Sequence, residues 1–454
     1  MHRMTMVALC GLLASGCAAV HEKTLDNGLR VIVKEDHRSP VVASQLWYKI
    51  GSMDEPEGIT GVSHVVEHMM FKGTQRLKPN EFSRIIAENG GRENAFTSSD
   101  FTGYHQQLEK SRLPISFELE ADRMQNLALS PQEFSNEIKV VMEERRLRTD
   151  DSPEGLLYEK FMATAYQVHP YRNPVIGWMR DLENLKVSDV RQWYERFYGP
   201  NNAVLAVVGD VSPKDVFDLA QKYFGNDRPR TIDRPTIPQE PPQTAERRVR
   251  VAAPAEVPQV MLGYHVPVIT PNDLNDMPDP YALSVAAAVL DGGGAARLPR
   301  ELVRERQIAA GVEASYSPLG RSPNMFVVGG TPASGHKIDE VEQALRAQVA
   351  RLRDELVSPA ELKRIKAQVV AGDVYARDSV YYQAMRLAQI ASLGLDLRLP
   401  ELYVERVNSV TAEQVQAVAR RYLVDANLTV AVLDPLPMQP GARRPVPAGG
   451  AHVR

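Results

Sequence analysis

GVSHVVEHMM, residues 61–70, is the most informative stretch of this sequence. On a helix, His64 and His68 are four residues apart and lie on one face, so their imidazoles can bind one zinc ion. Glu67 lies near the same face, where its carboxylate can accept a proton from a water molecule at the metal. Apolar residues fill the neighbouring positions, Val62, Val65, Val66 and Met69. The stretch predicts a buried metal-binding helix, and the alternative is two core histidines beside a salt-bridged glutamate.

A third metal ligand is expected from another helix, because catalytic zinc usually binds three protein side chains and a water molecule. Residues 129–150 are the candidate segment, since Ser130 and the glutamate three residues later form a capping box that begins a helix. Glu137 and Glu144 are seven residues apart and lie toward the packed side of this helix, where a carboxylate needs a partner such as zinc. Glu143 is turned about 100° away from Glu144. Periodicity alone leaves both of these glutamates open as the third ligand.

The bulk composition is that of an ordinary globular protein. Its 454 residues, 43% hydrophobic and 24% charged, are enough for two or three domains. The net charge of -4 provides no basic field for neutralising phosphates, so we expect no nucleic-acid partner. The two cysteines, Cys10 and Cys17, both lie near the N-terminus, which leaves none for a disulfide or a thiolate zinc site. Histidine and carboxylate side chains must therefore hold any metal.

Residues 1–21 have the pattern of a bacterial export signal, because the apolar run 6–13 follows a basic N-terminus and precedes small residues. LASGC, residues 13–17, resembles the lipobox of bacterial lipoproteins, although Ala14 replaces the usual leucine. The alternative is an ordinary cleaved signal with an incidental cysteine. No later stretch reaches the roughly 18–20 apolar residues of a transmembrane helix. We expect a periplasmic protein whose membrane attachment, if it has one, is a lipid on Cys17.

The mature chain divides into two similar halves. A proline-rich segment, residues 226–246, lacks helical or strand periodicity and is typical of an extended linker. Residues 190–209 align with residues 415–434 at a constant offset, and both stretches predict a helix, a turn and a buried strand. We infer a duplicated α+β unit. The expected parts are an export segment at 1–21, a metal-binding domain at 22–230, a linker at 231–246, a homologous domain without metal at 247–435 and a disordered tail at 436–454.

The order H-x-x-E-H reverses the commoner H-E-x-x-H of zinc peptidases and resembles the inverzincins of the pitrilysin and insulinase type. Four further stretches carry the resemblance, TLDNGLRVIV at 24–33, NAFTSSDFTGY at 94–104, NEIKVVMEE at 136–144 and HPYRNPVIG at 169–177. The length and the two halves look most like the shorter branch of the family, which includes the subunits of mitochondrial processing peptidase. The resemblance implies an α+β fold of two homologous halves, each a mostly antiparallel sheet with helices packed on it. It also implies a dimer whose subunits enclose a chamber.

The resemblance implies roles for particular residues as well. The third zinc ligand of the family falls on Glu144, which favours this glutamate over its neighbour in the sequence. His64, His68 and Glu144 would then hold one zinc ion per chain, with Glu67 as the general base. A glutamate that assists catalysis in the family falls on Glu137.

A peptide-binding strand is the next implied feature. The N-A-x-T strand of the family lies beside the substrate backbone, which implies that Asn94, Ala95 and Phe96 line the cleft with Thr97 behind them. Binding by strand addition requires an extended peptide. Without the resemblance, residues 94–107 are simply a polar, alternating edge strand.

One departure from the family concerns the second half. Complete enzymes of the family carry there an arginine followed seven residues later by a tyrosine, and both hold the scissile carbonyl. Here Arg304 is followed by Gly311, and Tyr316 has the wrong spacing. Loss of one such donor typically costs about 100- to 1000-fold in rate. We therefore expect a homologous partner subunit to supply the pair, in a homodimer or a heterodimer.

These observations predict a zinc metalloendopeptidase that hydrolyses extended peptides or unfolded segments in the periplasm as one subunit of a dimer. Two other functions fit the same residues. One is a non-catalytic partner or assembly subunit of the same fold, although the intact H-x-x-E-H argues against it. The other is a lipoprotein that binds periplasmic peptides without cleaving them.

Overall fold

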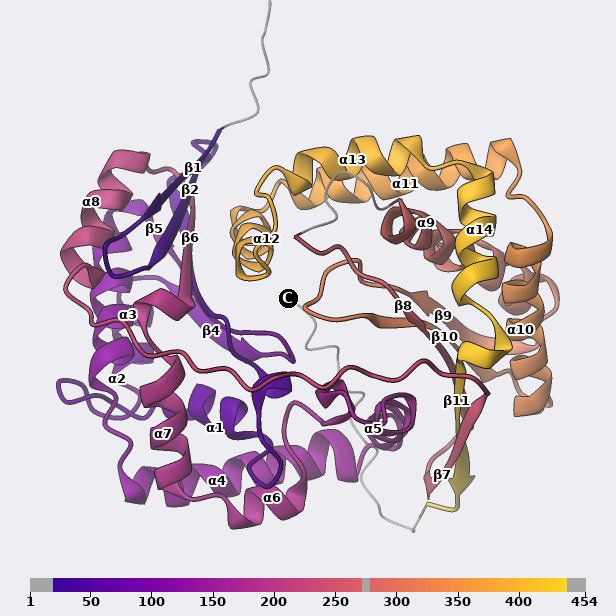
Figure 1. Ribbon diagram of the computed structural model, residues 1–454, viewed down its shortest axis with the longest axis horizontal. Helices are drawn as coiled ribbons and strands as arrows, with labels where there is room; N and C mark the ends of the chain where they lie inside the picture. Colours follow the sequence, from indigo (N-terminus) through magenta and orange to yellow (C-terminus); the bar gives the residue numbers. More distant parts are fainter. Residues whose placement is uncertain (1–18, 272–277, 439–454) are drawn as a thin grey trace, which may run out of the picture.

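Two mixed β-sheets organise the chain, one in each half (Figure 1). The structure, a computed structural model, describes residues 19–271 and 278–438. The first sheet has the strand order β1 (Val20–Thr24), β2 (Arg30–Glu35), β6 (Ala203–Gly209), β3 (Val41–Tyr48), β5 (Thr102–Glu109) and β4 (Arg92–Thr97). Within this sheet only β2 and β6 run parallel to each other. The predicted mostly antiparallel sheet is therefore confirmed in the first half.

The second sheet repeats this strand order without an equivalent of β1. Its order is β7 (Arg247–Pro254), β11 (Leu428–Leu436), β8 (Gln259–Val266), β10 (Asn324–Pro332) and β9 (Ala309–Ser315). Only β7 and β11 are parallel, and this pair corresponds to β2 and β6. The helix before β6, α7 (Val187–Phe197), likewise corresponds to α14 (Ala412–Tyr422) before β11. The expected α+β fold of two homologous halves is confirmed.

Helices cover one face of each sheet with apolar side chains. On the first sheet these are α1 (Val62–Met69), α2 (Glu81–Glu88), α3 (Leu113–Asn126), α7 and α8 (Pro213–Phe224). On the second sheet they are α9 (Asp279–Asp291), α10 (Ile338–Asp354) and α14, joined by α11 (Pro359–Ala376) and α13 (Leu399–Ser409). Each half thus has its own apolar core between the strands and these helices.

The other face of each sheet is covered by a helix from the opposite half. Helix α12 (Val380–Ser392) of the second half packs on β3 and β6, and α5 (Pro153–Ala165) of the first half packs on β7 and β11 (Figure 1). Ala384 and Ala388 are small, so α12 lies close to Trp47 and Val204 in a shared apolar cluster. The sequence predicted helices on each sheet but not this exchange.

Two helices of the first half carry the predicted metal ligands. Helix α1 begins after Gly61, whose φ of 88° is in the left-handed region, and a Cβ there would lie 2.5 Å from the carbonyl oxygen of Ile176. The carboxylate of Glu55 caps this helix, because it accepts hydrogen bonds from the N–H of Gly61 at 2.7 Å and from the N–H two residues later at 2.8 Å. Helix α4 (Pro131–Arg145) begins after the predicted N-cap Ser130 and continues as π-helical turns over Arg146–Asp150. Its extent is the predicted one.

Residues 225–246 connect α8 to β7 without a helix or a strand (Figure 1). The segment is extended, as the proline-rich sequence predicts, but it is also tied to the first half. The carboxylate of Glu240 accepts hydrogen bonds of 2.8–3.0 Å from the N–H groups of residues 167–169. Arg234 donates to the carbonyl of Lys49. The connection is therefore held against the first half at Arg234 and Glu240.

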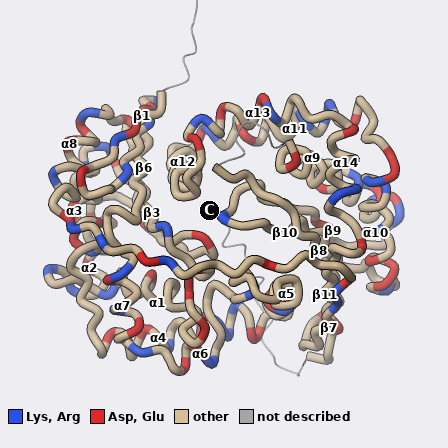
Figure 2. Tube along the Cα trace, in the orientation of Figure 1, with Lys and Arg blue, Asp and Glu red and all other residues tan. Residues whose placement is uncertain are grey.

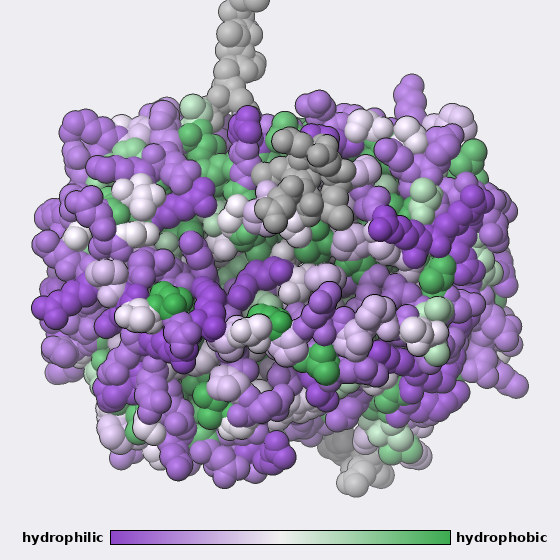
Figure 3. Space-filling model, viewed as in Figure 1, coloured by the Kyte–Doolittle hydropathy of each residue, from purple (hydrophilic) through white to green (hydrophobic). Residues whose placement is uncertain are grey.

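The part of the chain that the structure describes contains no helix long and apolar enough to cross a membrane. Acidic and basic residues are interspersed along the chain (Figure 2), and the face seen in Figure 3 is mainly hydrophilic with scattered hydrophobic residues. Cys10, Cys17, most of the predicted export segment and the tail from residue 439 lie outside the described residues. Strand β1 begins at Val20, two residues before the predicted start of the metal-binding domain.

Candidate metal centre

Three side chains from two helices converge at one point of the first half. His64 and His68 lie on α1, and Glu144 lies near the end of α4. The Oε2 atom of Glu144 is 3.8 Å from Nε2 of His64 and 3.3 Å from Nε2 of His68, and the three ligand atoms lie within 4.8 Å of one another. Within residues 19–271 and 278–438, no other group of three His, Cys, Asp or Glu side chains converges in this way. The structure brings together the three side chains that the family resemblance assigns as zinc ligands.

The spacing and chemistry of these atoms fit a zinc ion. Ligand atoms about 2.0–2.1 Å from a tetrahedral ion lie about 3.4 Å from one another, close to the separations of 3.3 and 3.8 Å found here. Two imidazole nitrogens and one carboxylate oxygen are a donor set of catalytic zinc sites, which keep a fourth position open. Glu143, the other candidate from periodicity, is exposed and pairs with Arg146 at 3.0 Å. It lies outside the group.

A carboxylate and an ammonium group lie behind His68. Its Nδ1 is 2.9 Å from Oε1 of Glu137, and Oε2 of Glu137 is 2.7 Å from Nζ of Lys72. Burial alone would raise the pKa of Glu137, but its hydrogen bonds with His68 and Lys72 lower it. An ionised Glu137 holds a proton of His68 on Nδ1, so Nε2 is the nitrogen that a metal would bind. The sequence identified Glu137 but not Lys72.

Burial and mutual contacts shift the pKa values of the three side chains in different directions, and a bound zinc ion would displace the Nε2 proton of His68. Burial, with a contribution from the charge of His68, lowers the pKa of His64 to about 4, so this imidazole is neutral. Burial alone would lower the pKa of His68, but hydrogen bonds with Glu137 and Glu144 outweigh it and raise the pKa to about 9. For Glu144 burial acts upward, yet the hydrogen bond with His68 and the nearby positive charges lower the pKa to about 2. Arg148 binds the other oxygen of Glu144 at 2.8 Å, which directs Oε2 at the imidazoles.

Glu67 is buried beside the ligands, with 9% of its surface exposed. Its Oε2 accepts a hydrogen bond of 2.6 Å from the hydroxyl of Thr97, the last residue of β4. Burial raises the pKa of Glu67, although this hydrogen bond and the charge of His68 act in the opposite direction. A raised pKa suits a carboxylate that exchanges protons near neutral pH. The sequence did not predict the contact with Thr97, but strand alternation places Thr97 and Ala95 on one face, and β4 packs against α1.

The residues predicted to bind peptide lie on β4, the edge strand of the first sheet. The N–H of Ala95 donates to the side chain of Asn94 at 2.9 Å rather than to β5, so it points to the free edge. The ring of Phe96 packs against Trp47, with 5.0 Å between ring centroids, on the face that α12 covers. The backbone of Ala95 is therefore open to a further strand, whereas the side chain of Phe96 is directed away from the edge.

The positions that correspond to the arginine and tyrosine pair of complete family enzymes lie in the second half. Arg304 is exposed, and its guanidinium donates to a carbonyl of the preceding glycine-rich loop. Gly311 lies on β9, and the space where its side chain would begin is open. The hydroxyl of Tyr316 donates to the carbonyl of Pro267 at 2.5 Å. These contacts of Arg304 and Tyr316 lie within their own half and not at the three ligands.

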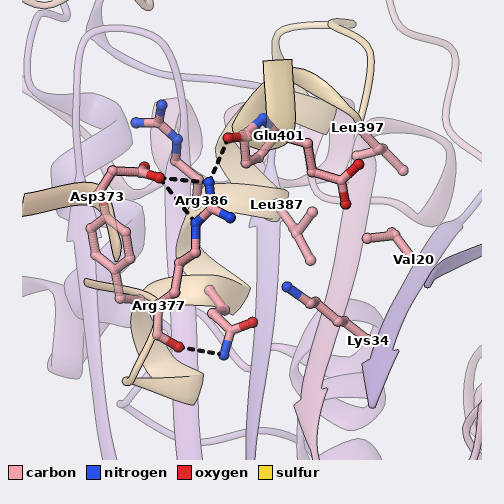
Figure 4. A pocket seen from close by; sticks show the side chains of 11 residues that line it. Val20, Lys34, Asp373, Arg377, Arg386, Leu387, Leu397 and Glu401 are labelled. Carbon is pink, nitrogen blue, oxygen red and sulfur yellow. Dashed lines mark hydrogen bonds and ion pairs between the residues drawn. The ribbon is translucent and has the colours of Figure 1, made fainter. Parts of the chain in front are cut away.

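A separate cavity lies between α12, α13 and the first two strands of the first sheet (Figure 4). Charged groups in its wall are paired with one another, since Arg377 binds Asp373 at 2.6 Å and donates to the carbonyl of Pro400 at 2.8 Å. None of the predicted site residues lines this cavity. It is a gap between the two halves, apart from the metal ligands.

Comparisons with families of known proteins match the chain in two parts. Residues 30–178 match the family described as insulinase, peptidase family M16, and residues 184–369 match the peptidase M16 inactive domain. The first part contains all three candidate metal ligands and Glu67, and the second part contains none of them.

Relatives named as zinc proteases cover most of the chain. Zinc protease PqqE of Helicobacter pylori is 36% identical over 354 residues, which cover 76% of this chain and 78% of that protein. An uncharacterized zinc protease of Mycobacterium leprae is 27% identical over 429 residues, 93% of each chain. Among solved structures, a protease from Helicobacter pylori has a TM-score of 0.86 and 32% identity, over 92% of this chain and 100% of that chain. The similarity extends over both halves.

Proposed function

The chain belongs to the insulinase family of peptidases, peptidase family M16, and from this membership we propose that it is a zinc metalloendopeptidase that cleaves extended peptides or unfolded segments. The observation that carries the proposal is the convergence of His64, His68 and Glu144 within 4.8 Å. The buried carboxylate of Glu67 lies beside them. This donor set suits one zinc ion per chain.

Each side chain has a separate task in the proposed reaction. His64, His68 and Glu144 hold the zinc ion, which when bound supplies a Lewis acid for the peptide carbonyl. Glu67 accepts a proton from the attacking water and returns it to the leaving amine. The hydrogen bond from Thr97 to Oε2 holds this carboxylate in one orientation. Burial excludes other water from the same space and strengthens these electrostatic interactions.

Glu137 acts through His68 rather than on the substrate. One of its oxygens lies 2.9 Å from Nδ1 of His68, and Lys72 binds the other at 2.7 Å. Carboxylates in this position orient a metal-binding imidazole and increase its basicity. We therefore assign Glu137 and Lys72 as positioning residues, a narrower role for Glu137 than the catalytic assistance expected from the sequence.

The edge strand favours an extended peptide as substrate. The free edge of β4 offers the N–H of Ala95, and an added peptide strand would replace the side chain of Asn94 as its acceptor. The strand ends at Thr97, which touches Glu67. A peptide added to β4 would therefore run toward the residues that hold the metal.

A second subunit completes the proposed enzyme. Arg304 and Tyr316 make hydrogen bonds within the second half, and position 311 is a glycine, so the expected arginine and tyrosine pair is incomplete here. A homologous subunit, in a homodimer or a heterodimer, would supply the pair. The N-terminal sequence supports a location in the periplasm, with or without a lipid on Cys17. Mass spectrometry of the mature N-terminus separates these two forms.

The test of the function is a comparison of Glu67→Gln with Glu143→Gln. Both changes replace a glutamate by its isosteric amide, but Glu143 is exposed and pairs with Arg146 outside the metal group. We expect both variants to bind about one zinc per chain, as the wild type does. Hydrolysis of an unstructured peptide should fall about 100- to 10,000-fold in Glu67→Gln alone.

The assay is run with the chain alone and with a homologous subunit that carries the arginine and tyrosine pair. Metal-loaded Glu67→Gln with wild-type turnover would contradict the assignment of the general base. A folded wild-type chain that binds no zinc would contradict the whole proposal and favour a peptide-binding subunit without catalysis.

A further inference from the structure

A loop of the second half reaches the turn that follows the edge strand β4. The loop, residues 316–323, joins β9 to β10, and the turn, residues 98–101, joins β4 to β5. The backbone N–H of Arg321 donates to Oδ2 of Asp100 at 3.2 Å, and Nη1 of Arg321 donates to the carbonyl oxygen of Asp100 at 3.4 Å. Arg321 therefore contacts the turn through its backbone and its side chain.

The same guanidinium binds a second aspartate of the first half. Nη1 and Nη2 of Arg321 donate to the two carboxylate oxygens of Asp54 at 2.6 and 2.9 Å, and the side chain of Asp54 is fully buried. Such a bidentate pair fixes the plane of the guanidinium as well as its position. Asp54 belongs to the 3-10 turn Ser52–Asp54, whose N–H groups donate to the carbonyls of Ser98 at 3.1 Å and Ser99 at 3.0 Å. The turn 98–101 is thus held between this backbone and Arg321.

Close packing leaves this turn little room to move. A Cβ at Gly51 would lie 2.4 Å from the carbonyl oxygen of Ser98, so the two segments approach each other at a distance that only glycine allows. On the other side, the hydroxyl of Tyr171 donates to Oδ1 of Asp100 at 2.6 Å. The first half thus places Gly51 and Tyr171 around the turn, and the second half places Arg321 there.

The position of the turn affects the proposed site through Thr97. This residue is the last of β4, directly before the turn, and its hydroxyl donates to Glu67 at 2.6 Å. A shift of the turn would therefore move both the strand that a peptide would join and the group that orients the general base. We propose that Arg321 is a positioning residue for peptide binding, because it clamps the β4–β5 turn and so holds the free edge of β4 in register with Glu67. This inference rests on the peptidase function proposed above, and it gives the second half a task in substrate recognition.

Arg234 provides a matched control. It also pairs with Asp54, through Nη1 at 3.2 Å, but its other contacts are with the carbonyl of Lys49 and with Oδ1 of Asn202 at 2.6 Å. Arg321→Gln and Arg234→Gln each remove one guanidinium from the same buried carboxylate. Only the first change also removes a side-chain contact with the turn, so the two variants should lose similar stability and differ at β4.

The experiment measures backbone hydrogen exchange and peptide binding in the full chain. Exchange at residues 97–103 should rise about tenfold in Arg321→Gln and stay near wild type in Arg234→Gln, because local opening requires the clamp to release. In the Glu67→Gln background, the Kd of a fluorescent unstructured peptide should rise about tenfold for Arg321→Gln only. Arg321→Lys, which keeps one charge and the backbone contact, should recover part of both losses and still fold if Arg321→Gln does not.

Two results would overturn the inference. One is equal exchange at residues 97–103 in the two glutamine variants, and the other is faster exchange in Arg321→Gln without weaker peptide binding. Failure of the wild-type chain to hydrolyse peptide, even with the homologous subunit present, would instead count against the proposed function. The exchange and binding measurements require no turnover, so the two failures are distinguishable.

Discussion

Glu137→Gln should weaken zinc binding about 10- to 100-fold, the usual effect of losing a carboxylate that supports a histidine ligand. This loss corresponds to about 1.4–2.7 kcal/mol. The amide keeps the shape of the side chain, but it removes the charge that binds His68 at 2.9 Å and Lys72 at 2.7 Å. Glu137 is only 7% exposed, so water cannot replace that charge. The imidazole of His68 would then lose the negative charge that holds its proton on Nδ1 and leaves Nε2 for the metal.

Competition with a chromophoric zinc chelator measures this affinity without any substrate. Glu143→Gln is the control on the same helix, and it should leave the affinity unchanged because Glu143 pairs with Arg146. His68→Ala sets the upper limit, since it removes a ligand. If Glu137→Gln binds zinc within about twofold of the wild type while kcat falls, Glu137 takes part in proton transfer, and the assignment as a positioning residue is refuted.

Three further changes have defined outcomes. Thr97→Val removes the 2.6 Å hydrogen bond to Glu67, so kcat should fall about tenfold. The zinc content, measured by atomic absorption, should stay constant, and loss of zinc would contradict this explanation. Arg123→Met should lower the free energy of unfolding in urea by about 3–5 kcal/mol. It leaves the buried carboxylate of Glu120 without the guanidinium that binds it at 2.5 Å, although the amide of Gln106 still donates to it. An unchanged midpoint would count against that pairing. Burial raises the pKa of Asp227 from 3.8 to about 7, so the folded state holds an extra proton in this window and loses stability as pH rises through it. Asp227→Asn should therefore raise the melting temperature at pH 8 far more than at pH 4, and equal effects would disprove the shift.

Most of the metal group could be predicted because it depends on local geometry. His64 and His68 need only the repeat of one helix, and the start of α4 follows from the capping residue Ser130. The choice of Glu144 over Glu143 needed the resemblance or the structure, since one residue turns a side chain by about 100°. The sequence of α4 is polar enough that its packed side is weakly marked.

Contacts between distant segments could not be predicted from the sequence in the same way. Periodicity shows which face an element buries, but not which element it meets. Thr97 and Glu67 are 30 residues apart, and Arg321 and Asp54 are 267 residues apart. The apolar face of α12 is compatible with either sheet, so nothing local assigns it to the first. The roles of peptide, partner subunit and lipid stay predictions, because they concern molecules beyond this chain.

Helices α5 and α12 each pack on the sheet of the opposite half, and this limits where the chain can be truncated. A fragment ending in the proline-rich segment would keep the three candidate metal ligands and Glu67. It would lack α12, so Trp47 and Val204 would be exposed to water. The complementary fragment would lack α5 and expose the corresponding face of its own sheet. Large bare apolar surfaces of this kind promote aggregation. We therefore expect that truncation between the halves will not yield a stable metal-binding domain, because each half needs a helix of the other to cover its sheet.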